Sequence, residues 1–418
     1  MNKIKKTLPE LRFPEFKDAG EWEEKKLGGI LIKNSTKNKK QKYSLVQSVS
    51  NKFGLINQEE YFENRRIAGK DTSNYYVIKK GYFAYNPSRI DVGSLAYKYD
   101  NETSIISPLY VSFKADNKLV LDCFLLNWFD SENFTKQMIF EGGVRNTLNY
   151  ESLIQIKILL PPSINEQQRI AACLSSLDEL ISAHSQKLEL LKAHKKGLMQ
   201  NLFPQEGKKE PELRFKEFED SGEWEEKLLG DCLTQKPEYG INASAVPYSD
   251  KLPTYLRITD ISEDGYFLTN NKMSVNMEVS EDNFLNEGDI VLARTGASVG
   301  KSYKYKKRDG ELVFAGFLIR VRPNVKKLNA DMLFHFLSTH QYWAWVSFIS
   351  ARSGQPGING TEYSSMPIIL PPKIEEQQKI ASCLSSLDEL ITAQSKKIEQ
   401  LKQHKKGLMQ GLFPKINE

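Results

Sequence analysis

The stretch from Leu160 to Pro204 reads LPPSINEQQRIAACLSSLDELISAHSQKLELLKAHKKGLMQNLFP. It returns at Leu370–Pro414 as LPPKIEEQQKIASCLSSLDELITAQSKKIEQLKQHKKGLMQGLFP. The two copies align without a gap at an offset of 210 and differ at 11 of 45 positions. The segments that separate the repeated pieces, residues 29–159 (the first insert) and 231–369 (the second insert), show little similarity to each other. A frame kept in duplicate with divergent inserts suits a protein that recognises two different things.

A shorter pair of repeats precedes each insert. Pro9–Gly28 and Pro211–Gly230 share the pattern PELRF, EF and GEWEEK at an offset of 202. The order short repeat, insert and long repeat therefore occurs twice along the chain.

The long repeat predicts a helix with apolar residues at alternating spacings of four and three. A period of 3.5 residues held over more than four heptads is typical of a coiled-coil seam. Prolines at both ends, Pro161–Pro162 and Pro204 in the first copy, mark the start and stop of the helix. The predicted seam is Ile170, Leu174, Leu177, Ile181, His184, Leu188 and Leu191 in the first copy, and Ile380, Leu384, Leu387, Ile391, Gln394, Ile398 and Leu401 in the second.

Such a stripe has two interpretations: the helix packs on the core of its own domain, or the two helices pair with each other. We favour pairing, in which the polar residues His184 and Gln394 fix the register. These two residues do not choose the orientation, because parallel and antiparallel pairing both bring them together. The long second insert, which must return the chain, favours the antiparallel arrangement. Lys195 and Lys405 interrupt the stripe a second time.

Both inserts read as α/β segments of similar size. In the second insert we expect strands in TYLRITDIS, Gly288–Ala293 and Gly316–Pro323, and a helix over Asp331–Phe348. In the first insert we expect strands in YSLVQSVS, GYFAYN and SPLYVSFK, and a helix over Asp122–Phe140. The similar order predicts one fold used twice.

The bulk composition sets broad limits. A chain of 418 residues exceeds one ordinary core and predicts at least two domains. Its net charge of +5, from 58 basic and 53 acidic residues, suits a nucleic-acid partner but does not demand one. The four cysteines have no metal-ligand spacing, and no long apolar run or signal pattern occurs, so we expect a cytoplasmic protein with reduced thiols.

Two segments resemble catalytic motifs without matching them. Thr295–Ser302, TGASVGKS, has one residue too few between its glycines for a phosphate-binding loop. Tyr85–Ser88, YNPS, lacks the second proline and the aromatic residue with which adenine methyltransferases hold a flipped base. No histidine, cysteine or paired-carboxylate constellation stands out. We therefore predict a protein that is not an enzyme, with no bound metal or cofactor.

The repeats resemble the specificity subunit of type I restriction-modification enzymes. The resemblance rests on GEWEEKKLGG and GEWEEKLLGD, on LPPSINEQQRIAACLSSLD and LPPKIEEQQKIASCLSSLD, and on EGDIVLARTGASVGK. It implies two α/β (α+β) target recognition domains separated by two long helices that pair as an antiparallel coiled coil, in a pseudo-two-fold, circular arrangement. It also implies partners: double-stranded DNA, two methyltransferase subunits and two restriction (motor-nuclease) subunits, which hold S-adenosylmethionine, ATP and Mg²⁺.

The resemblance divides the chain into six segments. They are an N-terminal segment (1–22), recognition domain 1 (23–159), a central helix (160–204), a linker with the short repeat (205–224), recognition domain 2 (225–369) and a C-terminal helix (370–418). From Ile170 to Leu202 a helix spans roughly 48 Å, enough to set two domains on successive major grooves about 34–36 Å apart.

Base readout requires polar side chains on loops, and phosphate contacts outnumber base contacts in such interfaces. The predicted DNA-binding residues in the first insert are Arg65, Arg66, Lys70, Asn86, Arg89, Arg145, Asn146 and Asn149. Those in the second insert are Arg294, Thr295, Ser298, Lys301, Arg352, Gln355 and Asn359.

Two other functions fit the same pattern. One is a DNA-binding adaptor that recruits a different nuclease or methyltransferase. The other is a scaffold whose inserts bind polypeptides. A binding affinity that falls steeply with added salt separates the nucleic-acid functions from the scaffold.

Overall fold

The computed structural model describes residues 7–51, 53–61, 69, 71–138, 147–351 and 355–415. The chain forms two compact units. Unit 1 contains Met1–Ser185 and Lys396–Glu418, and unit 2 contains Gln186–Ser395. The long helices α5 (Ile164–Leu202) and α9 (Ile374–Leu412) each contribute one half to each unit. A unit therefore combines one insert with two half-helices from distant parts of the sequence.

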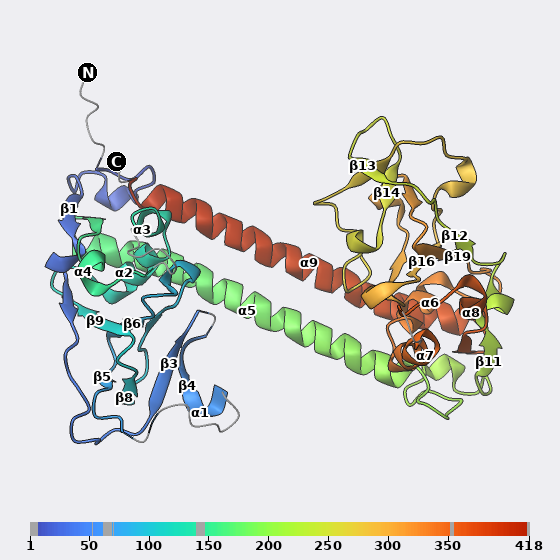
Figure 1. Cartoon of the computed structure of the whole chain (residues 1–418), viewed down its shortest axis with the longest axis horizontal. Helices are drawn as coiled ribbons and strands as arrows, with labels where there is room; N and C mark the ends of the chain where they lie inside the picture. Colours follow the sequence, from blue (N-terminus) through green and yellow to red (C-terminus); the bar gives the residue numbers. More distant parts are fainter. Residues whose placement is uncertain are drawn as a thin grey trace. The chain divides into compact units, whose positions relative to one another are not determined.

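Unit 1 holds two four-stranded sheets (Figure 1). The first has the order β2 (Leu31–Lys33), β9 (Val111–Ala115), β6 (Tyr82–Tyr85) and β7 (Leu95–Tyr97), and is antiparallel throughout. The second has the order β4 (Gly54–Asn57), β3 (Val46–Ser50), β8 (Ser104–Ile106) and β5 (Tyr76–Ile78), with β3 and β8 parallel. A separate ribbon pairs β1 (Glu23–Lys26) with β10 (Lys157–Leu160).

Unit 2 repeats this plan, except that the fourth strand of its second sheet lies at the opposite edge. One sheet has the order β12 (Glu238–Tyr239), β19 (Leu318–Val321), β16 (Ile290–Ala293) and β17 (Ser302–Lys304). The other has the order β13 (Ala245–Pro247), β15 (Met273–Val275), β14 (Thr254–Leu256) and β18 (Leu312–Phe314), with β14 and β18 parallel. A ribbon pairs β11 (Glu225–Leu228) with β20 (Pro367–Leu370). The prediction of one fold used twice is confirmed.

The helices of the inserts are shorter than the sequence predicts. The helix expected at Asp331–Phe348 is two helices, α6 (Ala330–Phe336) and α7 (His340–Ser350). The break occurs because the Thr339 side chain caps α7 by accepting a hydrogen bond from the Tyr342 N–H. The helix expected at Asp122–Phe140 is α2 (Asp122–Phe129) and α3 (Glu132–Thr135), and residues 139–140 lie outside the described part of the chain.

Three further short α-helices lie in the described parts of the inserts. They are α1 (Gln58–Tyr61) and α4 (Tyr150–Leu153) in the first insert and α8 (Gly360–Ser364) in the second. Asn149 and Asn359 occupy the same position, each capping the helix that follows it.

Each unit has its own core, and both long helices enter it. In unit 1 the start of α5 and the end of α9 pack among insert residues; the members include Trp22, Phe124, Trp128, Ile170, Leu174, Leu412 and Phe413. In unit 2 the end of α5 and the start of α9 do the same; the members include Trp224, Met332, Tyr363, Ile380, Leu384, Leu202 and Phe203. Because the start of one helix meets the end of the other in both units, the pairing is antiparallel, as predicted (Figure 1).

The chain closes on itself in unit 1. The Leu11 N–H donates to the Gly411 carbonyl at 2.8 Å, and Lys415 pairs with Glu10 at 3.1 Å. The equivalent residues in unit 2 make the same backbone bond, from the Leu213 N–H to the Asn201 carbonyl at 2.9 Å. The end of α9 therefore meets the first short repeat as the end of α5 meets the second, which confirms the circular arrangement.

Candidate nucleic-acid interface

The repeated glutamate at the start of each long helix anchors the short repeat. In unit 1 the Arg12 guanidinium donates to both carboxylate oxygens of Glu166, at 2.7 and 2.8 Å. In unit 2 Arg214 and Glu376 make the same two-pronged pair at 2.8 Å. Both glutamates are buried, and the hydrogen bond with the glutamate raises the pKa of each arginine. A bidentate Arg–carboxylate pair also fixes orientation, so it sets the angle at which the short repeat meets the helix.

The next residue, a glutamine, ties each helix to its insert. Gln167 accepts from the Leu121 N–H at 2.9 Å and donates to the Leu119 carbonyl at 3.0 Å, at the start of α2. Gln377 makes the corresponding pair with the Asn329 N–H and the Lys327 carbonyl, at the start of α6. The repeated Glu-Gln-Gln sequence thus holds each insert against the start of its long helix.

Ion pairs cross between the two helices inside each unit. Lys195 on α5 pairs with Asp388 on α9 at 2.7 Å in unit 2. The repeat-equivalent pair in unit 1 joins Lys405 to Asp178, also at 2.7 Å. The second polar interruption of the apolar stripe therefore reaches a carboxylate on the other helix.

The predicted seam positions are buried or half-buried along both helices. Ile170, Leu174, Ile380 and Leu384 belong to the cores of the units, so the first interpretation, packing on the helix's own domain, describes the starts of the helices. The remaining seam positions are Leu177, Ile181, His184, Leu188, Leu191, Leu387, Ile391, Gln394, Ile398 and Leu401. The proposed pairing of His184 with Gln394 stays a prediction.

In unit 1 the structure brings two predicted DNA-binding loops together. The Leu148 N–H donates to the Pro87 carbonyl at 3.0 Å, which joins the loop of Asn86 and Arg89 to the loop of Asn149. The Asn86 side chain accepts from the Ser88 N–H, whereas Arg89 is exposed. The other predicted residues of this insert, Arg65, Arg66, Lys70, Arg145 and Asn146, lie outside the described residues.

Unit 2 joins the corresponding loops. The Ile358 N–H donates to the Arg294 carbonyl at 2.8 Å, and the Gly296 N–H donates to the Pro356 carbonyl at 3.0 Å. Arg294, Thr295 and Ser298 follow β16 and lie beside the loop that contains Gln355. Arg352 lies outside the described residues.

Several predicted DNA-binding side chains already have structural partners. The oxygens of Asn149 and Asn359 accept the Ser152 and Glu362 N–H groups, at 2.8 and 2.9 Å. Lys301 pairs with Glu263 at 2.7 Å. Contact of these three residues with DNA stays a prediction, and it requires them to serve both roles or to exchange partners.

The two units differ in the groups near the cross-helix ion pair. In unit 2 the buried His335 lies 3.9 Å from Asp388 and 3.1 Å from the Ser385 hydroxyl. Burial, followed by the charges of nearby lysines, lowers the pKa of His335 to about 3. In unit 1 burial raises the pKa of Asp130, which also senses Asp178 and Lys405.

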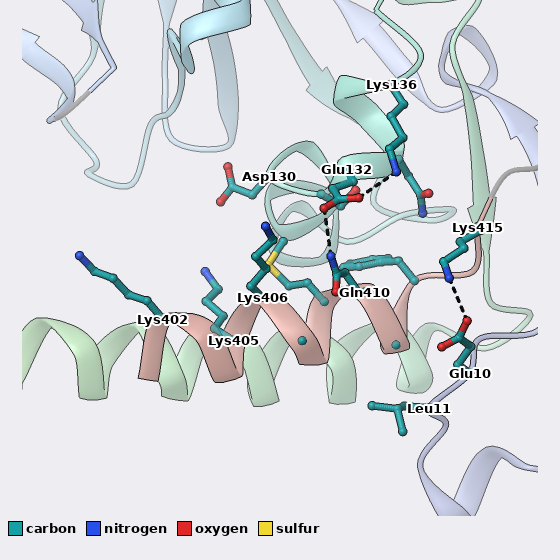
Figure 2. Close-up of a pocket in the computed structure, with 16 residues that line it drawn as sticks. Glu10, Leu11, Asp130, Glu132, Lys136, Lys402, Lys405, Lys406, Gln410 and Lys415 are labelled. Carbon is teal, nitrogen blue, oxygen red and sulfur yellow. Dashed lines mark hydrogen bonds and ion pairs between the residues drawn. The ribbon is translucent and has the colours of Figure 1, made fainter. Parts of the chain in front are cut away.

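Each unit contains a groove beside the C-terminal part of a long helix. The groove in unit 1 has a volume of about 890 Å³ and is lined by Lys402, Lys405, Lys406 and Gln410 of α9 and by residues 130–133. Figure 2 shows the three lysines projecting from α9 on the side of Asp130 and Glu132. The groove in unit 2, of about 900 Å³, is lined by the repeat equivalents Lys192, Lys195, Lys196 and Gln200 of α5.

The described residues contain no group of three or more His, Cys, Asp or Glu placed to hold a metal ion. The described helices include none that is long and apolar enough to cross a membrane. The glycines of Thr295–Ser302 lie in the turn between the antiparallel strands β16 and β17, whereas a phosphate-binding loop leads into a helix.

The sequence profile of the type I restriction modification DNA specificity domain matches residues 19–193 and 222–403. These two matches cover most of the chain. The chain belongs to the type I restriction-modification specificity family. Specificity subunits are non-catalytic, which agrees with the broken catalytic motifs of this sequence.

Individual relatives agree with this assignment. The type I restriction enzyme MjaVIII specificity subunit of Methanocaldococcus jannaschii is 27% identical over 320 residues, covering 73% of this chain and 72% of the relative. A second protein of that organism, provisionally named the MjaX specificity subunit, is 24% identical over 417 residues, covering 93% and 92%. The crystal structure of the M. genitalium S subunit, 14% identical, shares the fold with a TM-score of 0.60 over 98% of this chain and all of its own.

The anchoring residues of this specificity subunit cannot be recognised from its sequence. The Arg12–Glu166 and Arg214–Glu376 pairs stand in the repeated motifs, so duplication marks the residues without giving their partners. The Tyr239 ring lies 4.9 Å from the guanidinium carbon of Arg294, and the Phe317 carbonyl accepts from the Arg294 N–H. The sequence does not mark these two residues, because aromatic residues near strands are usually core residues.

Proposed function

We propose that this specificity subunit reads a DNA target in two parts, with one recognition domain for each part. The observation that carries the proposal is that the two units share the strand order of their first sheet, the glutamine hydrogen bonds that hold each insert to its long helix, and the loop junctions, but not the loop residues. At the junction that follows β6 or β16, unit 1 has Asn86-Pro87 and unit 2 has Arg294-Thr295. A common frame with different side chains suits two half-sites of different sequence.

The same frame would carry two methyltransferase subunits, one at each groove. The supporting observation is that repeat-equivalent lysines and a glutamine line both grooves. Docking of two copies at equivalent surfaces would place one methyltransferase on each half of the target. Adenine methylation would then follow from S-adenosylmethionine held by those subunits, and restriction from two motor-nuclease subunits that use ATP and Mg²⁺.

The test of two-part reading is sequencing of methylated adenines in cells that express this subunit with its methyltransferase. The expected motif has two short specific parts separated by a spacer of fixed length. Cells that express either protein alone should show no such methylation. A single continuous motif, or no motif in the presence of both proteins, would contradict the proposal.

The docking surfaces can be tested by charge reversal on the exposed lysines of each groove. Lys402→Glu with Lys406→Glu should remove one methyltransferase from the complex, and Lys192→Glu with Lys196→Glu the other. The matched controls are Lys397→Glu and Lys187→Glu, which change exposed lysines of the same helices outside the grooves. Native mass spectrometry reads the stoichiometry. Two methyltransferases retained by all four variants would show that the grooves are not the docking sites.

The alternative is an adaptor that recruits a different nuclease or methyltransferase. Purification of the complex from the host distinguishes the two, since the adaptor would co-purify with an enzyme outside the type I system. A scaffold for polypeptides would show binding without a steep dependence on salt.

A further inference from the structure

Arg294 stands at the junction of the two loops of unit 2, and its main chain is held on both sides. Its N–H donates to the Phe317 carbonyl at 3.0 Å, and its carbonyl accepts from the Ile358 N–H at 2.8 Å. Residue 294 directly follows β16, which pairs with β17 on one side and β19 on the other. The Cα of Arg294 is therefore fixed by a sheet rather than by a free loop.

The side chain of Arg294 is held as well. Its guanidinium carbon lies 4.9 Å from the centre of the Tyr239 ring. The Tyr239 hydroxyl in turn accepts from the Gly360 N–H at 3.0 Å, and its backbone pairs with Ile319 in β12–β19. A guanidinium stacked on an aromatic ring keeps its in-plane N–H groups available for a ligand.

Arg294 differs from the other described arginines of unit 2 in having no carboxylate partner. The pairs made by the others are Arg214–Glu376, Arg257–Asp260, Arg308–Asp309, Arg320–Glu238 and Arg322–Asp289. The Nε of Arg294 is buried and has no hydrogen-bond partner among the described residues. No carboxylate of the described residues neutralises Arg294, so its charge stays available for a ligand.

The surroundings of Arg294 resemble a surface for base edges rather than for a phosphate alone. Phe317, whose carbonyl holds the Arg294 N–H, is 61% exposed. Gln355 is exposed and lies close to Gly296, where an added Cβ would come within 3.4 Å of its amide nitrogen. Positive φ at Gly296, +77°, permits this close turn. An apolar ring and an amide beside an arginine are groups that contact base edges in the major groove.

We propose that Arg294 reads a guanine in the half-site of the second recognition domain. The inference rests on the proposed function and assigns one side chain to one base. Arginine forms two hydrogen bonds to guanine, at O6 and N7, and no other base offers that pair of acceptors in the major groove. The contact with the Tyr239 ring positions the guanidinium, so that both bonds can form together.

The experiment compares adenine methylomes of cells that carry the methyltransferase with wild type, Arg294→Lys or Arg294→Gln. Lysine keeps the positive charge but loses the planar fork, so it retains a phosphate contact and loses the bidentate contact with guanine. Both variants should weaken the preference for guanine at one position in the second half of the motif. Discrimination against other bases there should fall about 5- to 140-fold, which corresponds to the roughly 1–3 kcal/mol of one bidentate pair.

The first half of the motif is an internal control for folding and assembly, because unit 1 reads it independently. Arg308→Gln, which changes an arginine with a 61% exposed side chain in the same unit, should leave the whole motif unchanged. If Arg294→Lys and Arg294→Gln leave every position of the second half equally specific, or if only Arg294→Gln weakens methylation uniformly, Arg294 contacts phosphate and the inference is wrong. A wild-type motif without two parts would instead contradict the proposed function.

Discussion

Units 1 and 2 hold their inserts with the same bonds and differ in what those bonds present. The Arg–Glu pair, the glutamine hydrogen bonds to the insert and the cross-helix Lys–Asp pair occur in both, at repeat-equivalent positions. The loop junctions are also shared, yet Asn86 in one corresponds to Arg294 in the other. Residues kept in both copies build the frame, and we propose that the loop residues that differ face the target.

The shared bonds themselves are not identical. In unit 1 the Trp22 indole N–H also donates to Glu166, at 3.3 Å, whereas the Trp224 indole N–H has no partner among the described residues. In unit 2 Asp388 lies near His335, while Asp178 of unit 1 is 51% exposed. Identical sequence motifs can therefore stabilise the two units by different amounts. Substitution of each pair of equivalent residues measures that difference.

The largest effect is expected from the glutamate anchors. Glu166→Ala and Glu376→Ala each remove the bidentate carboxylate partner of an arginine whose side chain is only 9% or 8% exposed, which should cost about 3–5 kcal/mol in the free energy of unfolding of the affected unit. Glu166→Ala should cost about 1 kcal/mol more, because it also removes the acceptor of Trp22. Hydrogen exchange resolved by unit measures both.

The control for the anchors is Glu189→Ala, on the exposed face of α5, which should change stability by less than about 0.5 kcal/mol. Equal losses for Glu166→Ala and Glu376→Ala would show that the Trp22 bond adds nothing to the first anchor.

The next largest effect is expected from substitutions in the seam between the two long helices. Leu177→Asp and Leu387→Asp place a charge at half-buried seam positions and should cost about 2–3 kcal/mol in their units. Combined, they should abolish methylation of the split site. Leu180→Asp with Leu390→Asp, at exposed leucines of the same helices, is the matched control for the isolated chain. Methylation of the same split site by the seam double variant would mean that the helices do not set the spacing.

Lowering the pH should change the free energies of unfolding of the two units in opposite directions. The pKa of His335 is about 3 in unit 2 against about 6.5 in an unfolded chain, so the unfolded state binds a proton first. The stability of unit 2 is complete above pH 6.5 and falls as the pH drops toward 3, by about 2 kcal/mol at pH 5. The raised pKa of Asp130 acts in the opposite sense in unit 1, since the folded state takes up the proton first on acidification. His335→Gln should remove this loss in unit 2, and a variant that melts with the wild-type pH dependence would contradict the assignment.

The smallest effect is expected from moving the ends of the chain. Joining Glu418 to Met1 and opening the chain at Gly207 should change stability by less than about 1 kcal/mol and keep both halves of the motif. Gly207 is exposed, and Leu11 already contacts Gly411 as Leu213 contacts Asn201. Opening at Ser185, inside α5, should abolish the two-part motif. Loss of one half-site in the Gly207 permutant would show that the two closures are not equivalent.

Most of the fold follows from the sequence, because periodicity and duplication are local signals. The 3.5-residue stripe predicts two paired helices, and the repeated order predicts two similar domains. The prediction of a single helix over Asp331–Phe348 is wrong, because the Thr339 side chain caps a new helix. A threonine in an apolar stretch gives no sign of that role until its backbone leaves the helical conformation.

Much less of the candidate interface follows from the sequence. Asparagine on a loop suits both a helix cap and a base contact, and Asn149 and Asn359 are caps in the structure. Lys301 reaches Glu263, 38 positions away, and Arg294 stacks on Tyr239 in a different strand. Partners that distant are set by tertiary packing, so local patterns identify polar loops without showing which side chains are free to bind.

Exchange of the first insert for that of another specificity subunit tests most directly the claim that one frame reads two sequences. The measurement is the adenine methylome of cells that express the exchanged chain with the methyltransferase. We predict that one half of the motif changes, while the other half and the spacer length stay as in the wild type. A motif in which both halves change, or neither does, would contradict independent reading by the two units.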